Sequence, residues 1–538
     1  MKRIRLFTVL MIVMSPVLLF AQPKNEHNSP LATTEKFKTL LTYISQFYVD
    51  SVMEDELVEE AIISMLEKLD PHSIYIPKEE VEATNAPLKG NFMGIGIRFQ
   101  ILKDTILVVN TIPGGPSQKL GIKEGDKIIK IEDENVAGTG IKTDGVRERL
   151  LGEKNTKVKV SIKRKGERKL LDFTITRDII PLYSIEASYM ARPEVGYIKL
   201  SNFAETSTKE FLKAVDSLKK QGMKSLILDL QGNGGGYLHI AHELCDEFID
   251  GNKLLVYTEG RSFPRKDYNA GKTGVFEKGK LVILIDESSA SASEIVTGAI
   301  QDWDRGLVIG RRSFGKGLVQ KPVNLPDGSM VRITTQRYYT PSGRCIQKPY
   351  EEGTEAYHKE KYQRYLNGEL TNKDSIKIPD SLKFQTRISK REVYGGGGII
   401  PDIFVAVDTS YVSDYYNDLL RKGVLNSFTL SYVDKNRKSL KKLYPDFKKF
   451  NETFKVDDKL MEEFKTYAKA EGVEFDEKGY TISKDHLHLR LKAGIAQNIW
   501  DYPMFFQIMN ELNPAYLEAL DAIQSGEFSK YKLAFTDN

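Results

Sequence analysis

Residues 281–302, LVILIDESSASASEIVTGAIQD, decide the fold of the central part of the chain. An apolar run is followed by a turn of small residues and then by a helical pattern, which predicts a buried strand leading into a helix. Serine is common at a helix start as a cap. The same place suits a nucleophile, because the helix amides face developing negative charge. The serines in this turn are Ser288, Ser289, Ser291 and Ser293.

Strands and helices alternate on both sides of this stretch. The runs SLILDL (225–230) and LVIG (307–310) predict buried strands, whereas TKEFLKAVDSLKK (208–220) has helical spacing. Because strands and helices alternate between about residues 183 and 405, we expect an α/β core there.

The regions outside this core have other patterns. Residues 31–86 repeat apolar positions at helical spacing, and 89–177 contain short β-branched runs separated by glycine turns. After about residue 405 the chain is helical and rich in aromatic residues. We therefore expect a multidomain α/β protein with a signal peptide (1–21), an N-terminal helical segment (30–86), an inserted β-domain (89–177), a mixed α/β core (178–405) and a mainly helical C-terminal domain (410–538).

The first residues have the pattern of an export signal. A basic start, Met1 to Arg5, precedes an almost unbroken apolar stretch from Leu6 to Phe20, and Ala21 offers a cleavage point. The apolar stretch is shorter than the roughly 20 residues that a membrane span needs. An uncleaved anchor stays open as an alternative, because Leu19 is a poor residue at the third position before the cut. We expect an exported protein of the periplasm or cell envelope.

Composition excludes several classes of protein. Hydrophobic residues make up 41% and charged residues 28% of the chain, which is typical of soluble globular proteins and not of polytopic membrane proteins or disordered chains. The net charge is +4, and removal of Lys2, Arg3 and Arg5 with the signal would leave 4 − 3 = +1. We therefore predict no nucleic-acid partner. Cys245 and Cys345 form no CxxC motif, and two free thiols are favoured over one disulfide.

A lysine is the best candidate to activate a serine. None of the histidines belongs to a familiar triad motif, and His239 and His242 lack the surrounding HExxH pattern of a metal site. A lysine can act as the base where burial lowers its pKa, and Ser-Lys sites are known variants of the triad. Lys316 stands out, because small and apolar residues flank it in SFGKG (313–317).

The same segment nearly matches a nucleotide-binding loop. GRRSFGKG (310–317) has the spacing of a P-loop, but a P-loop needs Ser or Thr after its lysine and then a helix. Here Gly317 occupies that position and a strand-like run follows. Nucleotide binding is therefore the weaker alternative.

Several motifs occur together in one order. They are LDPHSIY (69–75), ILDLQGNGGGYL (227–238), SSASASEIVTGAIQD (288–302), SFGKGLVQ (313–320), RYYTPSGRCIQ (337–347) and GIIPDI (398–403). In this set the chain resembles the carboxyl-terminal processing peptidases over roughly residues 35 to 405. That family is built on a Ser-Lys site and carries a PDZ domain.

The resemblance implies roles for particular residues. Ser291, the middle serine of SASASE, matches the nucleophile, and Lys316 of FGKG matches the general base. Gln320 matches the glutamine that orients this lysine. Asp302 matches an aspartate that is important in some members, although a structural role in the helix is equally open.

The resemblance also implies an oxyanion hole. Its donors would be the backbone amide of Ala292 and that of a glycine in the pair Gly235 and Gly236. The chain departs from the family at this turn, where Gln231 replaces the usual arginine and Gly234 the usual proline. Because of these two changes, the resemblance does not predict the local geometry of the turn, but neither change alters a catalytic atom.

Residues 89–177 resemble a PDZ domain, the alternative being an unrelated small β-domain. GGPSQKLGIKEGDKIIKIED (114–133) is similar to the helix and strand that follow the carboxylate loop in bacterial PDZ domains. The resemblance implies that backbone amides capture a peptide's terminal carboxylate and that the peptide adds to a strand edge. The carboxylate loop would consist of Met93, Gly94, Ile95, Gly96 and Ile97.

The predicted function is therefore that of a serine endopeptidase with protein substrates that have free C-termini. It would recognise the C-terminal regions of exported or envelope proteins and cut them through an acyl-enzyme, without metal or organic cofactor. A catalytically silent peptide-binding scaffold is the alternative. The N-terminal helices would form a homodimer or a packing lid. The lysines of KNRKSLKKLYPDFKKF (435–450) would be a solvated face or would associate peripherally with the anionic envelope.

Overall fold

The computed structural model describes residues 30–531 and residue 533. They fall into two compact units, one ending at Met65 and one beginning at Leu66. The predicted signal peptide, residues 1–21, lies outside the described residues. No helix in the described part has the length and apolarity that a membrane crossing needs.

The first unit consists of helices with apolar residues on their surface. It holds α1 (Pro30–Phe47) and most of α2 (Glu54–Glu67). Acidic residues in the first turn of α2 stabilise that helix, because they oppose the positive end of its dipole. No residue of α1 is buried, and Leu40, Tyr43 and Phe47 are all more than half exposed.

A small β-domain follows helix α3 (Lys78–Lys89). Its antiparallel sheet has the order β3 (Ile97–Ile101), β4 (Ile106–Thr111), β5 (Lys127–Ile131), β7 (Lys157–Lys163), β8 (Leu171–Thr176), and β6 (Glu134–Asn135) pairs with β5. Two short helices, α4 (Pro116–Lys119) and α5 (Thr143–Leu150), lie in this domain, and the ribbon of β2 (Asn91–Gly94) and β9 (Asp178–Pro181) joins it to the rest. Among the described strands β3 pairs only with β4, so its other edge is free.

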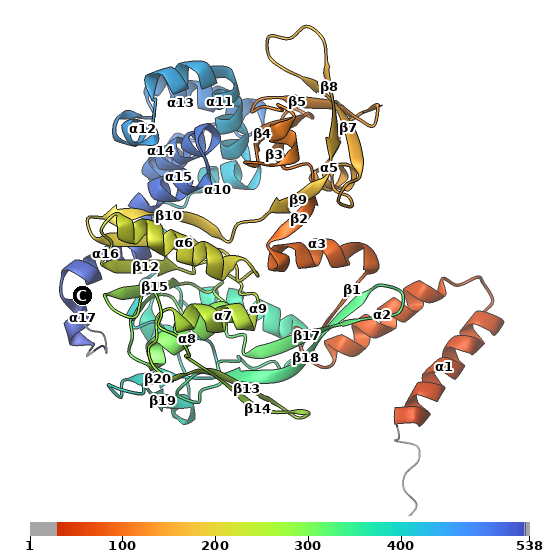
Figure 1. The fold of residues 1–538 in the computed structure, drawn as a ribbon, viewed down its shortest axis with the longest axis vertical. Helices are drawn as coiled ribbons and strands as arrows, with labels where there is room; N and C mark the ends of the chain where they lie inside the picture. The colour runs from red at the N-terminus through yellow and green to blue at the C-terminus, as the bar shows by residue number, and fades with distance from the viewer. Residues whose placement is uncertain (1–29, 532, 534–538) are drawn as a thin grey trace, which may run out of the picture. The chain divides into compact units, whose positions relative to one another are not determined.

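The core is a largely parallel sheet with helices on both faces. Its order is β10 (Ile185–Arg192), β11 (Val195–Leu200), β12 (Ser225–Asp229), β15 (Leu281–Ile285), β16 (Leu307–Gly310), β21 (Ile403–Phe404), and only β10 is antiparallel. Alternate residues point to opposite faces. One face packs against α6 (Ser207–Lys220), α7 (Leu238–Asp246) and α8 (Ala292–Asp302), and the other against α16 (Pro514–Gln524) (Figure 1).

A second sheet lies beside the carboxyl end of β15. Its order is β1 (Ile74–Ile76), β18 (Met330–Tyr339), β13 (Leu254–Gly260), β14 (Phe263–Asn269), and β17 (Leu318–Asn324) also pairs with β18. The segment after it holds α9 (Thr354–Leu366), η2 (Lys373–Ser375), η3 (Asp380–Leu382) and the pair β19 (Lys383–Gln385) and β20 (Glu392–Tyr394). The strand β17 follows Lys316, so the helix that a P-loop requires is absent here.

The C-terminal part is a helical domain with its own aromatic core. It contains α10 (Asp414–Arg421), α11 (Val424–Leu443), α12 (Phe447–Thr453), α13 (Asp458–Ala470), α14 (Glu477–Ile499), α15 (Tyr502–Met509), η4 (Asn510–Leu512), α16 and α17 (Glu527–Lys530). Side chains such as Asp446 and Asp457 cap these helices by accepting backbone N–H groups.

This helical domain also contacts the small β-domain. Leu430 of α11 packs on three apolar residues of the β3–β4 hairpin, and Arg98 of β3 lies 2.9 Å from Asp501. The two groups of elements are neighbours in the ribbon view (Figure 1).

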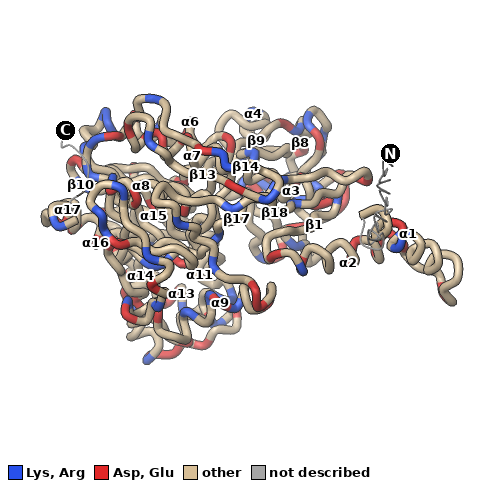
Figure 2. Tube along the Cα trace, turned by 90° about the horizontal axis from the view of Figure 1, so that it is seen from below, with Lys and Arg blue, Asp and Glu red and all other residues tan. Residues whose placement is uncertain are grey.

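The predicted mixed α/β class, with a β-domain, N-terminal helices and a mainly helical C-terminal part, is confirmed. The predicted domain boundaries themselves stay predictions. Both cysteines are free, as predicted. Basic and acidic residues are interspersed along the trace, as expected for a chain with a small net charge (Figure 2).

Candidate active site

The turn between β15 and α8 singles out one of its serines. Ser289 and Ser293 are fully buried and donate their hydroxyls to the carbonyls of Leu230 and Asn233 at 2.8 and 2.9 Å. Ser288 contacts the lysine side chain of Lys361. Ser291 alone among the four lines a cleft of about 340 Å³.

Ser291 has an unusual backbone. As the residue before α8 it has φ 57° and ψ −113°, a left-handed conformation that costs a residue other than glycine on the order of 1–3 kcal/mol. Such strain occurs where the surrounding structure holds a side chain in one direction, and here the side chain faces the cleft.

The cleft brings together the residues that the sequence assigned to catalysis. Ser291, Lys316 and Gln320 line it, and so do the three residues proposed for the oxyanion hole, which are Ala292, Gly235 and Gly236. Lys316 comes from the loop after β16 and Gln320 from β17. Asp302 does not line the cleft: it is fully buried at the far end of α8 and forms an ion pair of 2.7 Å with buried Arg344. The structural role of Asp302 is therefore the better supported one.

The surroundings of Lys316 favour its neutral form. Burial lowers the pKa of its amine, and the positive charge of Arg332 in the same cleft lowers it further. The carboxylates of Glu294 and Asp70 act in the opposite direction, but the pKa of Lys316 is lowered overall. A lysine that is neutral near physiological pH can accept a proton from a serine.

Glu294 is a residue of the site that the sequence analysis missed. Its side chain is fully buried, and one oxygen accepts the backbone N–H of Ser291 at 2.8 Å and that of Lys316 at 2.9 Å. The other oxygen accepts the hydroxyl of Ser313 and the N–H of Gly315. One carboxyl group therefore fixes the two catalytic segments to each other. The Ser-x-x-Glu spacing of a helix capping box was the signal in the sequence.

A second missed group supports Gln320. The Gln320 amide donates to the hydroxyl of Thr334 at 3.1 Å, and that hydroxyl donates to Asp70 at 3.0 Å. The buried Asp70 carboxylate also accepts the backbone N–H groups of His72 and Ser73. The LDPHSIY segment thus reaches the catalytic cleft through Thr334.

The glycine turn lies against Ser291. Gly235 has φ +103°, and a Cβ atom there would lie 2.8 Å from the Cβ of Ser291, so only glycine fits. Its N–H group donates to the side chain of Asn233 at 2.9 Å. In the described part of the chain, the amides of Gly236 and Ala292 donate to no protein acceptor. These two amides are the better candidates for the oxyanion hole.

Known families match this chain in several places. The model of peptidase family S41 matches residues 194–355, that of the PDZ domain 93–175, and that of the activating protease CtpB N-terminal domain 16–80. A family of unknown function matches residues 415–501. The carboxy-terminal processing protease CtpB of Bacillus subtilis is 34% identical over 362 residues, which cover 66% of this chain and 74% of that protein.

The chain belongs to the carboxy-terminal processing proteases. A probable CtpA-like serine protease of Staphylococcus aureus is 32% identical over 347 residues, covering 63% of this chain and 68% of that protein. Among solved structures, a photosystem II D1 C-terminal processing protease is 26% identical with a TM-score of 0.36, covering 69% of this chain and 86% of the other. The family resemblance predicted from the motifs is confirmed, and the chain is a serine peptidase.

In the PDZ domain of this carboxy-terminal processing protease, the segment predicted as the carboxylate loop joins β2 to β3. Gly94, Ile95 and Gly96 are buried, and Ile95 accepts both the N–H and the hydroxyl of Ser117 through its carbonyl. Met93 and Gly94 end β2, Ile95 and Gly96 form the connection, and Ile97 begins β3, whose free edge can pair with an added strand.

No metal centre is built into the described residues of this protease. Within residues 30–531 and 533 no three His, Cys, Asp or Glu side chains cluster as metal ligands. His239 lies beside Glu205, and His242 contacts the carbonyl of Asn269. His72 lies near Lys316, and burial is the main cause that lowers the pKa of its ring to about 3, so the ring stays neutral.

Proposed function

We propose that this protease cuts peptide bonds with Ser291 as the nucleophile and Lys316 as the general base, and that it acts on C-terminal regions of exported or envelope proteins. The observation that carries the proposal is the shared cleft, which Ser291 and Lys316 both line, together with the burial that lowers the pKa of the lysine. The catalytically silent alternative is disfavoured, since the family consists of serine peptidases.

The chemistry proceeds through a covalent acyl-enzyme. Neutral Lys316 takes the hydroxyl proton of Ser291, whose oxygen attacks the scissile carbonyl, and the lysine then protonates the leaving amine. The amides of Ala292 and Gly236 hold the oxyanion, and one such donor lowers the barrier by on the order of 2.7–4 kcal/mol. Lys316, neutral again, activates the water that releases the product. Gln320 holds the lysine in place.

The test compares the wild-type protein with Ser291→Ala and Lys316→Ala on fluorescein-labelled casein. Both variants are expected to lose at least about 10³-fold in turnover, as removal of a catalytic group does in other serine enzymes. Circular dichroism should show an intact fold, because neither side chain belongs to a packed core. A variant that keeps near-wild-type turnover would refute the assignment.

We also propose that the PDZ domain selects substrates by their free C-terminus. The loop from Met93 to Ile97 supplies the backbone amides and the edge of β3 supplies the strand partner. A fluorescent peptide should bind the Ser291→Ala protein more tightly than its amide-capped twin does, measured by anisotropy. Equal affinities would count against carboxylate capture.

Three further expectations stay predictions. Export to the periplasm or cell envelope depends on residues 1–21, outside the described part. The other two are peripheral association with the envelope through the lysines of α11 and α12, and self-association through the N-terminal helices.

A further inference from the structure

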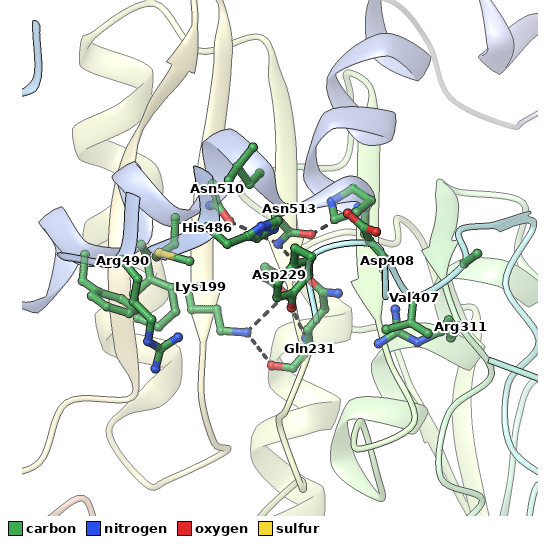
Figure 3. A pocket seen from close by; sticks show the side chains of 18 of the residues that line it. Lys199, Asp229, Gln231, Arg311, Val407, Asp408, His486, Arg490, Asn510 and Asn513 are labelled. Carbon is green, nitrogen blue, oxygen red and sulfur yellow. Dashed lines mark hydrogen bonds and ion pairs between the residues drawn. The ribbon is translucent and has the colours of Figure 1, made fainter. Parts of the chain in front are cut away.

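The C-terminal helical domain reaches the back of the glycine turn. The turn begins at Gln231, two residues after the end of β12, and ends at Gly236. Asn513, which precedes α16, donates its side-chain amide to the side-chain oxygen of Gln231 at 3.1 Å (Figure 3). Residue 513 lies far beyond the region that matches peptidase family S41, which ends at residue 355.

Asn513 is itself held rigidly. Its oxygen caps α16 by accepting the N–H groups of Ala515 and Tyr516, and its amide also contacts Asn510. The helix α16 is anchored on the central sheet, where the ring of Tyr516 packs edge-on against buried Tyr197 at 5.4 Å. The side-chain amide of Asn513, which donates to Gln231, is therefore held in a fixed position relative to the sheet.

The main chain of Gln231 is fixed from the other side. Its N–H donates to Asp229 at 2.8 Å, and its carbonyl accepts the amine of Lys199. Lys199 and Asp229 are both nearly fully buried and form an ion pair of 3.2 Å. Figure 3 shows Lys199, Asp229 and Asn513 around Gln231.

Open space adjoins this junction. A cavity of about 330 Å³ lies between the C-terminal helices and the strand ends, and Gln231, Asn513 and Lys199 are among its lining residues. Because the cavity leaves Gln231 without full packing on that side, polar contacts must hold the start of the turn in place. The other end of the turn touches Ser291 through Gly235.

We propose that Asn513 is a positioning residue for catalysis, which fixes the glycine turn through Gln231 and so sets the oxyanion hole. The inference rests on the proposed function, because it assumes that amides beside Ser291 stabilise the oxyanion. The C-terminal helical domain is then a working part of the catalytic site and not only an appended module.

A double-mutant cycle of Gln231→Glu and Asn513→Asp tests this. Each single variant keeps a hydrogen bond, since an amide on one side can donate to a carboxylate on the other, and Asp still caps α16. In the double variant two carboxylates face each other, so neither side chain can donate a hydrogen bond and the two charges repel. We expect turnover of labelled casein within about threefold of wild type for each single variant and at least about tenfold lower for the double variant, with KM little changed.

Two readouts separate positioning from a general loss of structure. The rate at which a fluorophosphonate probe labels Ser291 should fall with turnover in the double variant. Its activity relative to wild type should recover as the pH falls, because protonation of one carboxyl restores the hydrogen bond. The matched control combines Gln231→Glu with Ala406→Asp, which adds the same charges to the lining of the same cavity without altering a contact of Asn513 and should behave like Gln231→Glu alone.

Additive effects in the cycle, or equal losses in the control, would overturn the positioning role. If the double variant does not fold, Gln231→Ala decides: severalfold lower turnover at constant KM supports the role, and unchanged turnover refutes it. Failure of the proposed function looks different, since Ser291→Ala would then still cleave casein and the probe would not label wild-type protein.

Discussion

At the scale of single residues, Arg332 is one of the groups that lower the pKa of Lys316. It lines the same cleft, and after burial its charge is the next cause of the lowered Lys316 pKa. In the proposed mechanism only neutral Lys316 accepts the serine proton, so activity should rise as pH rises through the pKa of this lysine. Arg332→Met removes the charge and raises that pKa. The acid limb of the profile of kcat/KM against pH should therefore move to higher pH.

The control for this experiment is Arg337→Met. Arg337 lies on the same strand, β18, but its side chain is exposed and contacts Tyr350. Its pH profile should match that of the wild-type protein. An acid limb that stays in place or moves to lower pH in Arg332→Met would contradict the electrostatic account.

The sequence predicted the nucleophile and base, but by resemblance. From the residues alone, four neighbouring serines competed, since all have the same chemistry and lie at a helix start. The structure distinguishes them, because the hydroxyls of Ser289 and Ser293 donate hydrogen bonds to backbone carbonyls. Arg332 could not be predicted: its distance from Lys316 depends on how β17 and β18 pair.

At the scale of elements, the start of α8 depends on Glu294. Glu294→Gln keeps the shape but replaces one of the two accepting oxygens with an NH2 group, which faces N–H or O–H donors. The buried donors lose their acceptor, which costs about 1–3 kcal/mol of stability for an unsatisfied group. Because the Ser291 and Lys316 segments are then held less firmly, turnover should fall about 10-fold to 100-fold.

Denaturant unfolding and casein turnover check this prediction. Glu287→Gln is the matched variant, because Glu287 precedes the same turn and pairs with Arg311 outside the catalytic cleft. It should keep most of the activity. Turnover of Glu294→Gln within about twofold of the wild-type value would remove Glu294 from the positioning of the catalytic pair.

Local pattern predicted the strands β12, β15 and β16, since each is an apolar run of strand length. It did not predict that β1 pairs with β18 and thereby brings Asp70 close to Thr334. This pairing joins segments about 260 residues apart in the sequence, and the local propensities of the two segments do not indicate that they pair with each other.

At the scale of the whole molecule, we propose that α1 binds a second copy of the chain. None of its residues is buried, and its apolar residues Leu40, Tyr43 and Phe47 are exposed. Such a surface on a soluble protein indicates an interface. Wild-type protein should sediment as a dimer at micromolar concentration, and Leu40→Glu with Phe47→Glu should sediment as a monomer.

Lys38→Glu is the control, since Lys38 is an exposed polar residue of the same helix. It should leave the sedimentation coefficient unchanged. A monomeric wild-type protein, or a double variant that still dimerises, would refute self-association through α1.

The C-terminal helical domain is the part that the sequence predicted least well. Aromatic residues at helical spacing indicated a packed helical domain, which is correct. They did not indicate what the domain packs against. Contacts such as those of Leu430 with the PDZ domain and Asn513 with Gln231 depend on surface complementarity between distant segments.

The strained backbone at Ser291 has an evolutionary consequence. Glycine would adopt φ 57° there with less strain, so the chain keeps a side chain at a position where folding alone would favour its loss. In a duplicated gene copy released from the need to cleave, we expect drift to erase this serine early, whereas the hydrophobic residues beneath it persist. Inactive paralogues should thus be recognisable because they keep the hydrophobic residues of the sheet but lack the serine in the turn after β15.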